Sequence, residues 1–260
     1  MIYFVGAGPG DPELLTVKAL KLLGLAETVV YAGSLVNPAL LAFTRPGARL
    51  VDSSVLALEE IVEIMANAHR AGEMVVRLHS GDPSLFSAMG EQLEQLRERG
   101  IPFELVPGVS AWNAAAAALG REYTVPELTQ TLIITRVTGR TKVPPQESLA
   151  TLAQHRSSLC LFLSAGLAEE AARQLAEGYP PDTPVAIVQR ASWPDQRVWE
   201  GTVANLGSLA REAGVQRQAL ILVGEFLRGQ GRRSRLYAPG FTHGYRPAVK
   251  GRQTPKAGED

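Results

Sequence analysis

The sequence predicts an α/β protein, built as two α/β domains with an active-site cleft between them. Short apolar runs of strand length alternate with helical patterns in both halves of the chain, as in sheets covered by helices. In the first half, a glycine-rich loop at residues 6–12 follows the run Ile2–Val5. A second such loop, at residues 79–83, follows Met74–Leu78. Loops at the carboxyl ends of strands in one open sheet line a single crevice, so the two loops predict one ligand site.

The first half contains strands that alternate with helices, which favours a parallel sheet. Thr16 is a suitable N-cap for the first helix, and Gly72 and Gly100 end two later helices. The predicted strands are Ile2–Val5, Thr28–Tyr31, Met74–Leu78 and Phe103–Val106, and the predicted helices are Val17–Leu23, Leu58–Ala68, Ala88–Arg99 and Asn113–Leu119.

A turn-rich segment near Gly120–Thr129 marks the predicted boundary between the domains. We therefore expect an N-terminal α/β domain over residues 1–120, which carries the glycine loops, and a C-terminal α/β domain over residues 121–235. A tail over residues 236–260, rich in Gly, Arg, Pro and Lys, is predicted to be partly disordered, above all in its last ten residues. The second domain's predicted strands are Thr131–Thr135, Ser158–Leu163, Pro184–Val188, Val198–Val203 and Leu220–Val223, with helices over Ala168–Glu177 and Leu206–Ala213.

Composition excludes several classes of function. The 26 basic residues balance the 26 acidic ones, so charge gives no case for nucleic acid or an anionic membrane as partner. No apolar run approaches the roughly 18 residues of a spanning helix. The single cysteine, Cys160, lies in an apolar run, which predicts a buried thiol and fits a reducing cytoplasm. No His/Cys cluster has ligand spacing, so we expect no metal site.

A dinucleotide-binding turn is the first alternative for the loop at residues 6–12, and the residues do not fit it. Asp11 stands where that fingerprint needs its third glycine. Residues 31–33 are Tyr-Ala-Gly, where an acidic residue would hold the ribose. Pro9 and Pro12 also lie where a phosphate-binding helix opens with free N–H groups. A purely structural turn does not explain why two matched Gly-Asp-Pro loops occur.

Three motifs taken together resemble the tetrapyrrole methylases. They are Gly6–Thr16, Arg77–Pro83 and Val106–Ala111, in this order, and the resemblance runs from about Met1 to Arg246. Enzymes of this family use S-adenosyl-L-methionine to methylate uroporphyrinogen III and the precorrins. The resemblance therefore implies a methyltransferase with S-adenosyl-L-methionine as donor and S-adenosyl-L-homocysteine as product.

Four further stretches resemble one branch of that family, the precorrin-4 C11-methyltransferases. That branch belongs to the corrin ring pathway of cobalamin, in its oxygen-dependent or its cobalt-first version. The resemblance implies methylation at C11 of a precorrin-type tetrapyrrole, with or without cobalt, by a homodimer. The stretches are Tyr31–Val36, Gln130-Thr131 leading to Arg136, Arg190–Gln196, and Leu236-Tyr237 with residues 243–246.

The same resemblance implies which residues contact the donor between the two domains. Asp82 has a second interpretation, because Asp side chains in turns also bond their own backbone. Leu163 is placed to within one position. The implied donor contacts are Pro9, Ser80, Gly81, Asp82, Leu85, Ser110, Ala111, Leu163 and Ala191.

Methyl transfer from a sulfonium needs little covalent help, because the sulfur leaves as a neutral thioether. The enzyme's task is to align carbon, methyl and sulfur and to exclude water. Related methylases use a carboxylate just after the second strand, but residues 32–34 here are Ala-Gly-Ser. No catalytic residue is therefore assigned.

The acceptor implied by the resemblance carries many carboxylates, which arginine binds bidentately. Arg136 and Arg140 lie at and just after the end of one predicted strand, and Arg190 ends another. These three arginines are the predicted acceptor contacts. His79 is expected to be structural, and His243 and Tyr245 to make packing or partner contacts.

Three other functions remain open from the sequence. The first is a methylase of the same superfamily with another acceptor: a different precorrin carbon, uroporphyrinogen III, ribosomal RNA or a protein. The balanced charge and the stretch Arg190–Gln196 disfavour the nucleic-acid and protein acceptors. An NAD-dependent oxidoreductase and a non-catalytic binding protein are the others. Binding of S-adenosylhomocysteine against NAD separates the oxidoreductase, and turnover separates the binding protein.

Overall fold

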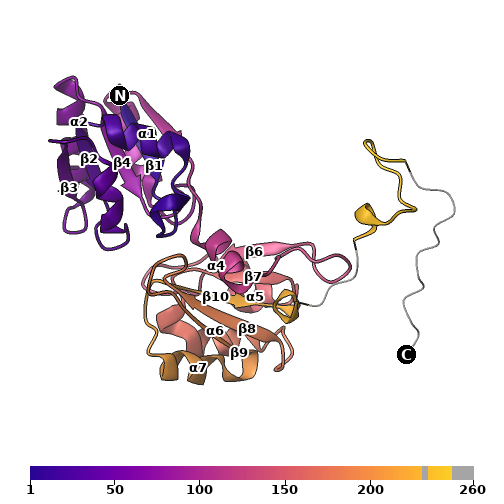
Figure 1. The fold of residues 1–260 in the computed structure, drawn as a ribbon. Coiled ribbons are helices and arrows are strands. Elements are labelled where there is room, and N and C mark those ends of the chain that lie inside the picture. The colour runs from indigo at the N-terminus through magenta and orange to yellow at the C-terminus, as the bar shows by residue number, and fades with distance from the viewer. Residues whose placement is uncertain (230–233, 248–260) are drawn as a thin grey trace, which may run out of the picture.

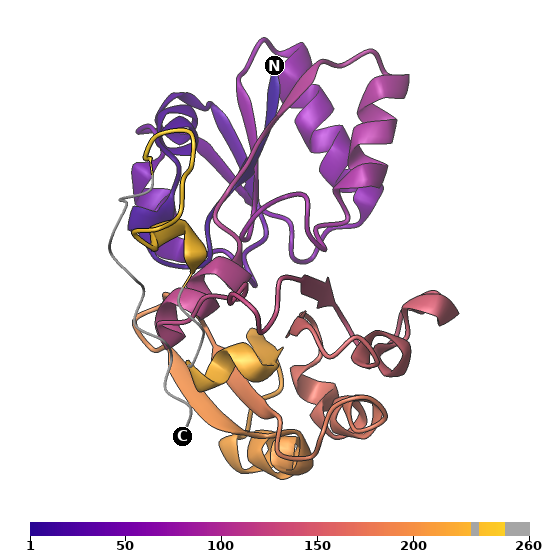
Figure 2. The same ribbon diagram turned by 90° about the vertical axis from the view of Figure 1, so that its right-hand side faces the viewer.

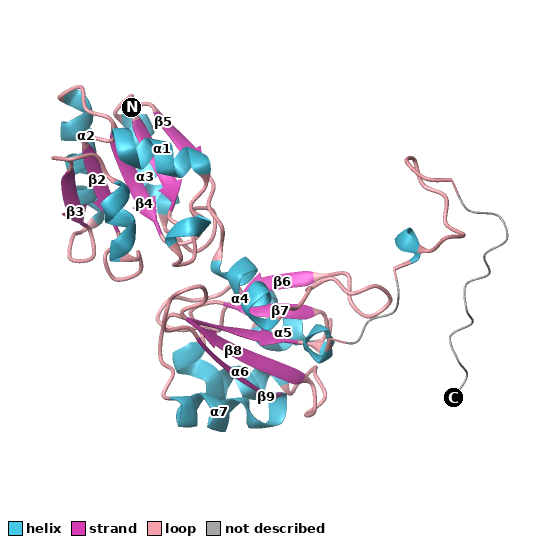
Figure 3. Cartoon of the chain, in the orientation of Figure 1, coloured by secondary structure: helices cyan, strands magenta, loops and turns pink. Residues whose placement is uncertain are grey.

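The computed structural model describes residues 1–229 and 234–247, which form two α/β domains, each around its own five-stranded sheet (Figure 1). Figure 3 shows the two sheets, with strands in magenta, as separate layers flanked by helices. The predicted fold class is confirmed.

The first sheet is entirely parallel, with strand order β3-β2-β4-β1-β5. The central strands β1 and β4 are buried on both faces of the sheet, as the short continuous apolar runs in the sequence predict. The strands are β1 Ile2–Gly6, β2 Thr28–Tyr31, β3 Arg49–Asp52, β4 Val75–His79 and β5 Phe103–Val106.

Helices cover both faces of the first sheet. Alternate strand residues point to opposite faces, so Ile2 and Phe4 pack with α2 and α3, whereas Val5 and Val76 pack with α1. Thr16 caps α1 as predicted, since its Oγ1 accepts from the Ala19 N–H at 3.1 Å. The helices are α1 Val17–Leu25, α2 Leu58–Arg70 and α3 Met89–Glu98.

The second sheet is mixed, with strand order β6-β7-β10-β8-β9. β6 and β7 are parallel, whereas β10 runs antiparallel to both β7 and β8, and β9 is antiparallel to β8. The elements are β6 Leu132–Thr135, β7 Ser158–Leu161, β8 Pro184–Gln189, β9 Arg197–Thr202 and β10 Ala219–Val223, with helices α5 Leu149–Ala153, α6 Ala168–Leu175 and α7 Leu206–Ala213.

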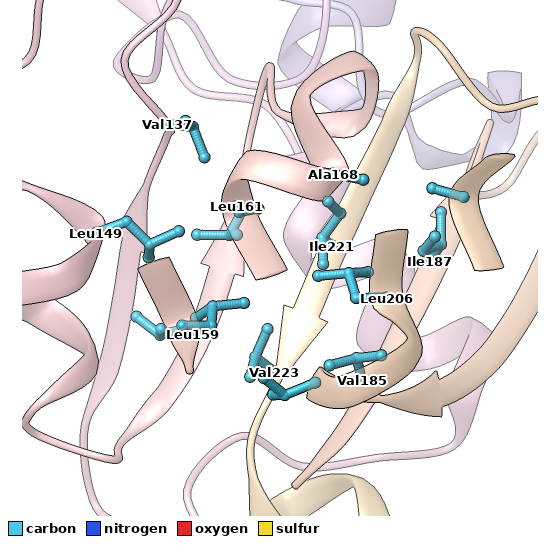
Figure 4. Close-up of a cluster of buried hydrophobic side chains, with 14 of the residues drawn as sticks. Val137, Leu149, Leu159, Leu161, Ala168, Val185, Ile187, Leu206, Ile221 and Val223 are labelled. Atoms are coloured by element: carbon cyan, nitrogen blue, oxygen red, sulfur yellow. The ribbon is translucent and has the colours of Figure 1, made fainter. Parts of the chain in front are cut away.

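The second domain's main core lies between this sheet and the helices α5, α6 and α7. Figure 4 shows strand residues such as Leu161, Ile187 and Ile221 facing helix residues such as Leu149 and Leu206. This cluster is sealed from solvent and gives the second domain a rigid base for its loops.

Helix α4, Ala111–Leu119, covers the opposite face of the second sheet. It lies in the range expected for the first domain, yet Ala114 and Ala115 pack with Cys160 and Ala186 of the second sheet. Figures 1 and 2 show α4 between the two domains. Cys160 is fully buried there, and burial raises the pKa of its thiol, so the prediction of a buried small side chain is confirmed.

Short 3₁₀ helices connect the main elements, at Pro12–Leu14, Pro38–Phe43, Pro145–Glu147, Ala165–Leu167, Val203–Asn205, Glu225–Arg228 and Arg235–Tyr237. In the tail, the Arg246 guanidinium donates to the Leu236 carbonyl at 2.7 Å and to the Ala238 carbonyl at 3.1 Å. The last ten residues, predicted to be disordered, lie outside the described residues. Within residues 1–229 and 234–247, no helix is long and apolar enough to cross a membrane. Over the same residues, no His/Cys/Asp/Glu group has the arrangement of a metal site.

Candidate active site

Three glycines bring the loops after β1, β4 and β5 into direct backbone contact. A Cβ at Gly108 would lie 2.3 Å from the Gly81 carbonyl oxygen and 2.7 Å from the Gly6 Cα. The first and second loops also bridge each other, since Gly81 N–H donates to the Gly8 carbonyl at 2.8 Å and Gly8 N–H returns the bond at 3.2 Å. Gly6 and Gly108 permit this approach because they lack a Cβ, so the three loops are packed against one another at the carboxyl edge of the sheet.

Asp82 ties the second loop to the third. Its Oδ2 accepts from the Gly108 N–H at 2.8 Å, and its Oδ1 accepts from the Ser84 N–H at 2.9 Å and from the Ser84 hydroxyl. Partial burial raises the pKa of this carboxyl, but these hydrogen bonds outweigh burial and hold the pKa below its usual value. Protein donors thus occupy both oxygens, which is the loop-stabilising interpretation; contact with a ligand stays a prediction.

A cavity of about 760 Å³ lies between the two domains, and Pro9 and Ser80 of the first two loops are in its wall. That volume lies within the usual range for sites that enclose a small molecule. The first domain and α4 supply Pro9, Ser34, Leu35, Ser80, Leu85, Phe86 and Ala111, and the second domain supplies Phe162, Leu163, Ala165, Val188, Arg190, Ala191, Trp193, Gln216, Arg217, Gln218, Ala219 and Leu220.

Most of the donor contacts implied by the sequence meet in this cavity, and a few lie just behind it. The ones in the wall are Pro9, Ser80, Leu85, Ala111, Leu163 and Ala191. Gly81, Asp82 and Ser110 belong to the loops but are not in the wall. Gly81 has φ +65°, a left-handed conformation, and a Cβ there would meet Ser110 Cα only at 3.7 Å. The glycine at position 81 is therefore required by its backbone conformation rather than by lack of space.

The three predicted acceptor arginines separate in the structure. Arg190 lies in the cavity wall. Arg136 donates instead to the carbonyls of Thr141 at 3.0 Å and Lys142 at 2.9 Å, and so holds the loop after β6. Arg140 is exposed on that loop, and neither it nor Arg136 lines the cavity.

Arg217 lines the cavity and was not among the predicted residues. It is exposed, and within the described residues its guanidinium has no hydrogen-bond or ion-pair partner. Phe86 and Phe162 were also missed; their rings lie 5.2 Å apart across the cleft. Phe162 lies near the carboxyl end of the predicted strand Ser158–Leu163, and Phe86 lies in the segment that follows the second glycine loop; these places are the signal that could have found them. Residues 216–218 carry no motif and precede a strand, so sequence gave no comparable signal there.

Within residues 1–229 and 234–247, no acidic side chain or histidine lines the cavity, and the charged wall residues are Arg190 and Arg217. Asp52, at the end of β3, accepts from the N–H groups of Ser54 at 2.8 Å and Gly33 at 3.0 Å, and these bonds lower its pKa. His79 is buried and stacked on Phe4, with ring centroids 5.8 Å apart. Apart from these two arginines the described wall is therefore uncharged, and it offers no carboxylate or imidazole that could act as a general base.

Fold and site together define a two-domain α/β protein with a cavity between its domains, beside glycine loops that are packed against one another. The tetrapyrrole (corrin/porphyrin) methylase family model matches residues 1–207, and the chain belongs to that family. A precorrin-4 C(11)-methyltransferase of Pseudomonas aeruginosa is 49% identical over 247 residues, which are 95% of this chain and 98% of the relative.

Solved structures agree with this assignment. The X-ray structure of a cobalt precorrin-4 methyltransferase superposes with a TM-score of 0.85 at 46% identity, covering 87% of this chain and 95% of the other. A uroporphyrin-III C-methyl transferase from Thermus thermophilus, complexed with S-adenosylhomocysteine, has a TM-score of 0.75 at 33% identity, covering 88% and 99%.

Proposed function

We propose that this chain is an S-adenosylmethionine-dependent C-methyltransferase of cobalamin biosynthesis, which methylates C11 of precorrin-4 or cobalt-precorrin-4. The observation that carries the proposal is the cavity between the domains, lined by Pro9 of the first glycine loop and Ser80 of the second, in a chain 49% identical to a precorrin-4 C(11)-methyltransferase. The NAD-dependent oxidoreductase and the non-catalytic binding protein lose ground, because a relative that matches 95% of this chain is a methyltransferase and the matching family model is that of the methylases.

The residues present fit the methyl donor. The part of the wall that the loops and the second domain contribute is made of small or apolar residues: Pro9, Ser80, Ala111, Leu163 and Ala191. S-adenosylmethionine supplies the activated methyl group when it is bound. We assign these wall residues to holding it, with Gly81, Asp82 and Ser110 fixing the loops behind them.

The chain's own contribution is positioning and exclusion of water. Alignment of two reactants can lower a barrier by roughly 7–11 kcal/mol. Phe86 and Phe162 close one side of the cavity, and Leu85 and Leu163 add apolar wall beside them. Among the described residues the wall contains no carboxylate or histidine, and we assign no general base.

The carboxylates of the acceptor are assigned to Arg190 and Arg217. These are the cations of the wall, and the Arg217 guanidinium has no partner among residues 1–229 and 234–247. Arg136 and Arg140 remain second candidates, because Arg136 is engaged with backbone carbonyls and Arg140 lies outside the wall.

A homodimer in the cytoplasm completes the proposal. Leu236, Tyr237 and Tyr245 of the tail are 46%, 69% and 100% exposed, which leaves apolar surface for a second copy. Light scattering at micromolar concentration is expected to give twice the chain mass; a species of 27.9 kDa would contradict the dimer.

Calorimetry tests the enzyme class. The purified protein is expected to bind one S-adenosylhomocysteine per chain and to give no heat with NAD. Binding of NAD without S-adenosylhomocysteine would overturn the proposed function.

A further inference from the structure

Two side chains of the second domain donate hydrogen bonds to backbone carbonyls of the first domain. The Trp193 Nε1–H donates to the Pro9 carbonyl at 2.9 Å, and the Gln218 Nε2–H donates to the Ser34 carbonyl at 2.9 Å. Ser192 adds a third bond, because its Oγ accepts from the Asp11 N–H at 3.0 Å. Pro9, Ser34, Trp193 and Gln218 all line the cavity, so these bonds span the site itself.

Arg190 contacts both of these side chains, Trp193 and Gln218, and so links them. Its guanidinium carbon lies 3.8 Å from the centroid of the Trp193 ring, and its Nη1 donates to Gln218 Oε1 at 3.1 Å. Asp195 holds the same guanidinium through a 2.7 Å ion pair with Nε. The chain of contacts therefore runs unbroken from the Pro9 carbonyl, through Trp193, Arg190 and Gln218, to the Ser34 carbonyl.

The first glycine loop is shaped to receive the indole. A Cβ at Gly10 would lie 2.1 Å from Cδ1 and Nε1 of Trp193, so a side chain at residue 10 would displace the ring. Asn37 holds this loop from the other side, since its Nδ2 donates to the Gly10 carbonyl at 2.8 Å. The loop and the ring thus fit each other across the domain boundary.

Backbone strain is concentrated at the same place. Arg190, Ser192 and Gln218 have φ values of +49°, +69° and +54°, in the left-handed region that non-glycine residues rarely adopt. Such conformations persist where surrounding contacts require them, and they gather at functional sites. Here Ser192 and Gln218 make hydrogen bonds across the cleft, and Arg190 joins Gln218 to Trp193.

We propose that Arg190, Ser192, Trp193 and Gln218 form an interdomain latch, a set of positioning residues that fixes the first glycine loop and the loop after β2 against the second domain. The latch sets the width of the cleft and the direction of the Pro9 carbonyl, and thereby the alignment of donor and acceptor. The inference deepens the proposed methyltransferase function and rests on it for its catalytic consequence.

Amide hydrogen exchange tests the latch without any enzyme assay. Within residues 7–13 the Asp11 amide is bonded to the second domain, whereas Ala7 and Gly8 bond within the first. Loss of one net hydrogen bond predicts that Ser192→Ala raises exchange at Asp11 about 2- to 12-fold. Ser208→Ala on α7 is the matched control, since it removes a hydroxyl that donates to the Asn205 carbonyl, and it is expected to leave exchange at Asp11 unchanged. Unchanged exchange in Ser192→Ala overturns the latch whatever the protein's function.

Ligand binding and kinetics test the positioning role. Trp193→Phe keeps an aromatic ring beside Arg190 but loses the N–H donor, and is expected to weaken S-adenosylhomocysteine binding and to lower kcat, each about 2- to 12-fold. Trp199→Phe on β9, which packs on the second domain's core, is the control. Thermal unfolding confirms that both variants are folded. If Ser192→Ala speeds exchange at Asp11 but Trp193→Phe leaves Kd and kcat unchanged, the contacts exist but position nothing, which also overturns the proposal.

A double-mutant cycle tests whether the latch is one unit. Because Arg190 ties Trp193 to Gln218, the losses in Trp193→Phe and Gln218→Ala are expected to combine to less than their product. Independent, multiplying losses would contradict a joined latch. If the wild-type chain itself binds no S-adenosylhomocysteine, the proposed function fails, and the exchange experiment still decides whether the latch exists.

Discussion

Replacing Gly108 by alanine should separate the three loops that are packed together at the carboxyl edge of the first sheet, beside the cavity. The new Cβ would lie 2.3 Å from the Gly81 carbonyl oxygen, and a tolerable contact needs at least 3.0 Å. The second loop must therefore retreat by about 0.7 Å, because the neighbouring atoms at Gly6 are also backbone and cannot rotate away. Overpacking of this kind typically costs about 1–3 kcal/mol of folding free energy.

The same displacement should also lower the activity. A misplacement of about 1 Å can reduce a positioned reaction roughly 100-fold, so kcat/KM should fall by about that factor. Urea unfolding measures the stability, and transfer of labelled methyl measures kcat/KM. Gly90→Ala is the matched control, since a Cβ there meets nothing within 4 Å and the residue lies in the first turn of α3. Wild-type stability and turnover in a folded Gly108→Ala would refute the packing argument.

Three further predictions concern an arginine, a histidine and the cysteine. Arg217→Ala should raise KM for the acceptor at least about 10-fold, as expected for a charge-assisted bond that the ligand desolvates, and leave the donor's Kd unchanged; a larger acceptor effect from Arg136→Ala would reverse the assignment. Burial and the charge of Arg77 lower the pKa of His79 to about 3, so the unfolded chain binds a proton there that the folded chain does not. The contribution of His79 to the free energy of unfolding should therefore be fully present above about pH 6.5 and fall by up to about 1.4 kcal/mol per pH unit below it. Urea unfolding between pH 7 and 5 should show a weaker dependence of stability on pH in a folded His79→Phe than in the wild type. An equal pH dependence in the two proteins would show that His79 does not titrate as argued. Cys160, whose thiol pKa is raised by burial, should react with a thiol reagent in urea and not in the native protein, and rapid native labelling would contradict its place in the core.

The regular elements were predictable where their signals were strong. Buried strands such as β1 and β4 appear as short apolar runs, and Thr16 marks the start of α1 through its side-chain cap. The edge strand β3, Arg49–Asp52, was missed because it is four residues long and mostly exposed, so it has neither an apolar run nor a clear alternation. The five-residue helix α5 was missed for the same reason of length.

Side-chain partners across the domains were much harder to predict. Arg136 looked free for a ligand in the sequence, but it folds back onto the carbonyls of its own loop. Trp193 lies inside a stretch that the sequence singled out, yet its contact with Pro9 joins residues 184 positions apart and depends on how the domains meet. Arg217 becomes a wall residue for the same reason. Local patterns predict elements and loops, whereas a cleft between two domains is set by their packing.

The most direct test of the account is the position of the transferred methyl group. The purified protein is incubated with S-adenosylmethionine carrying a ¹³C-labelled methyl and, in separate reactions, with uroporphyrinogen III, the trimethylated precursor and precorrin-4 in its metal-free and cobalt forms. Nuclear magnetic resonance of the products then locates the label. We predict a single labelled methyl at C11 of a precorrin-4 form. Label on uroporphyrinogen III or on another ring carbon, with precorrin-4 left unmethylated, would contradict the assignment.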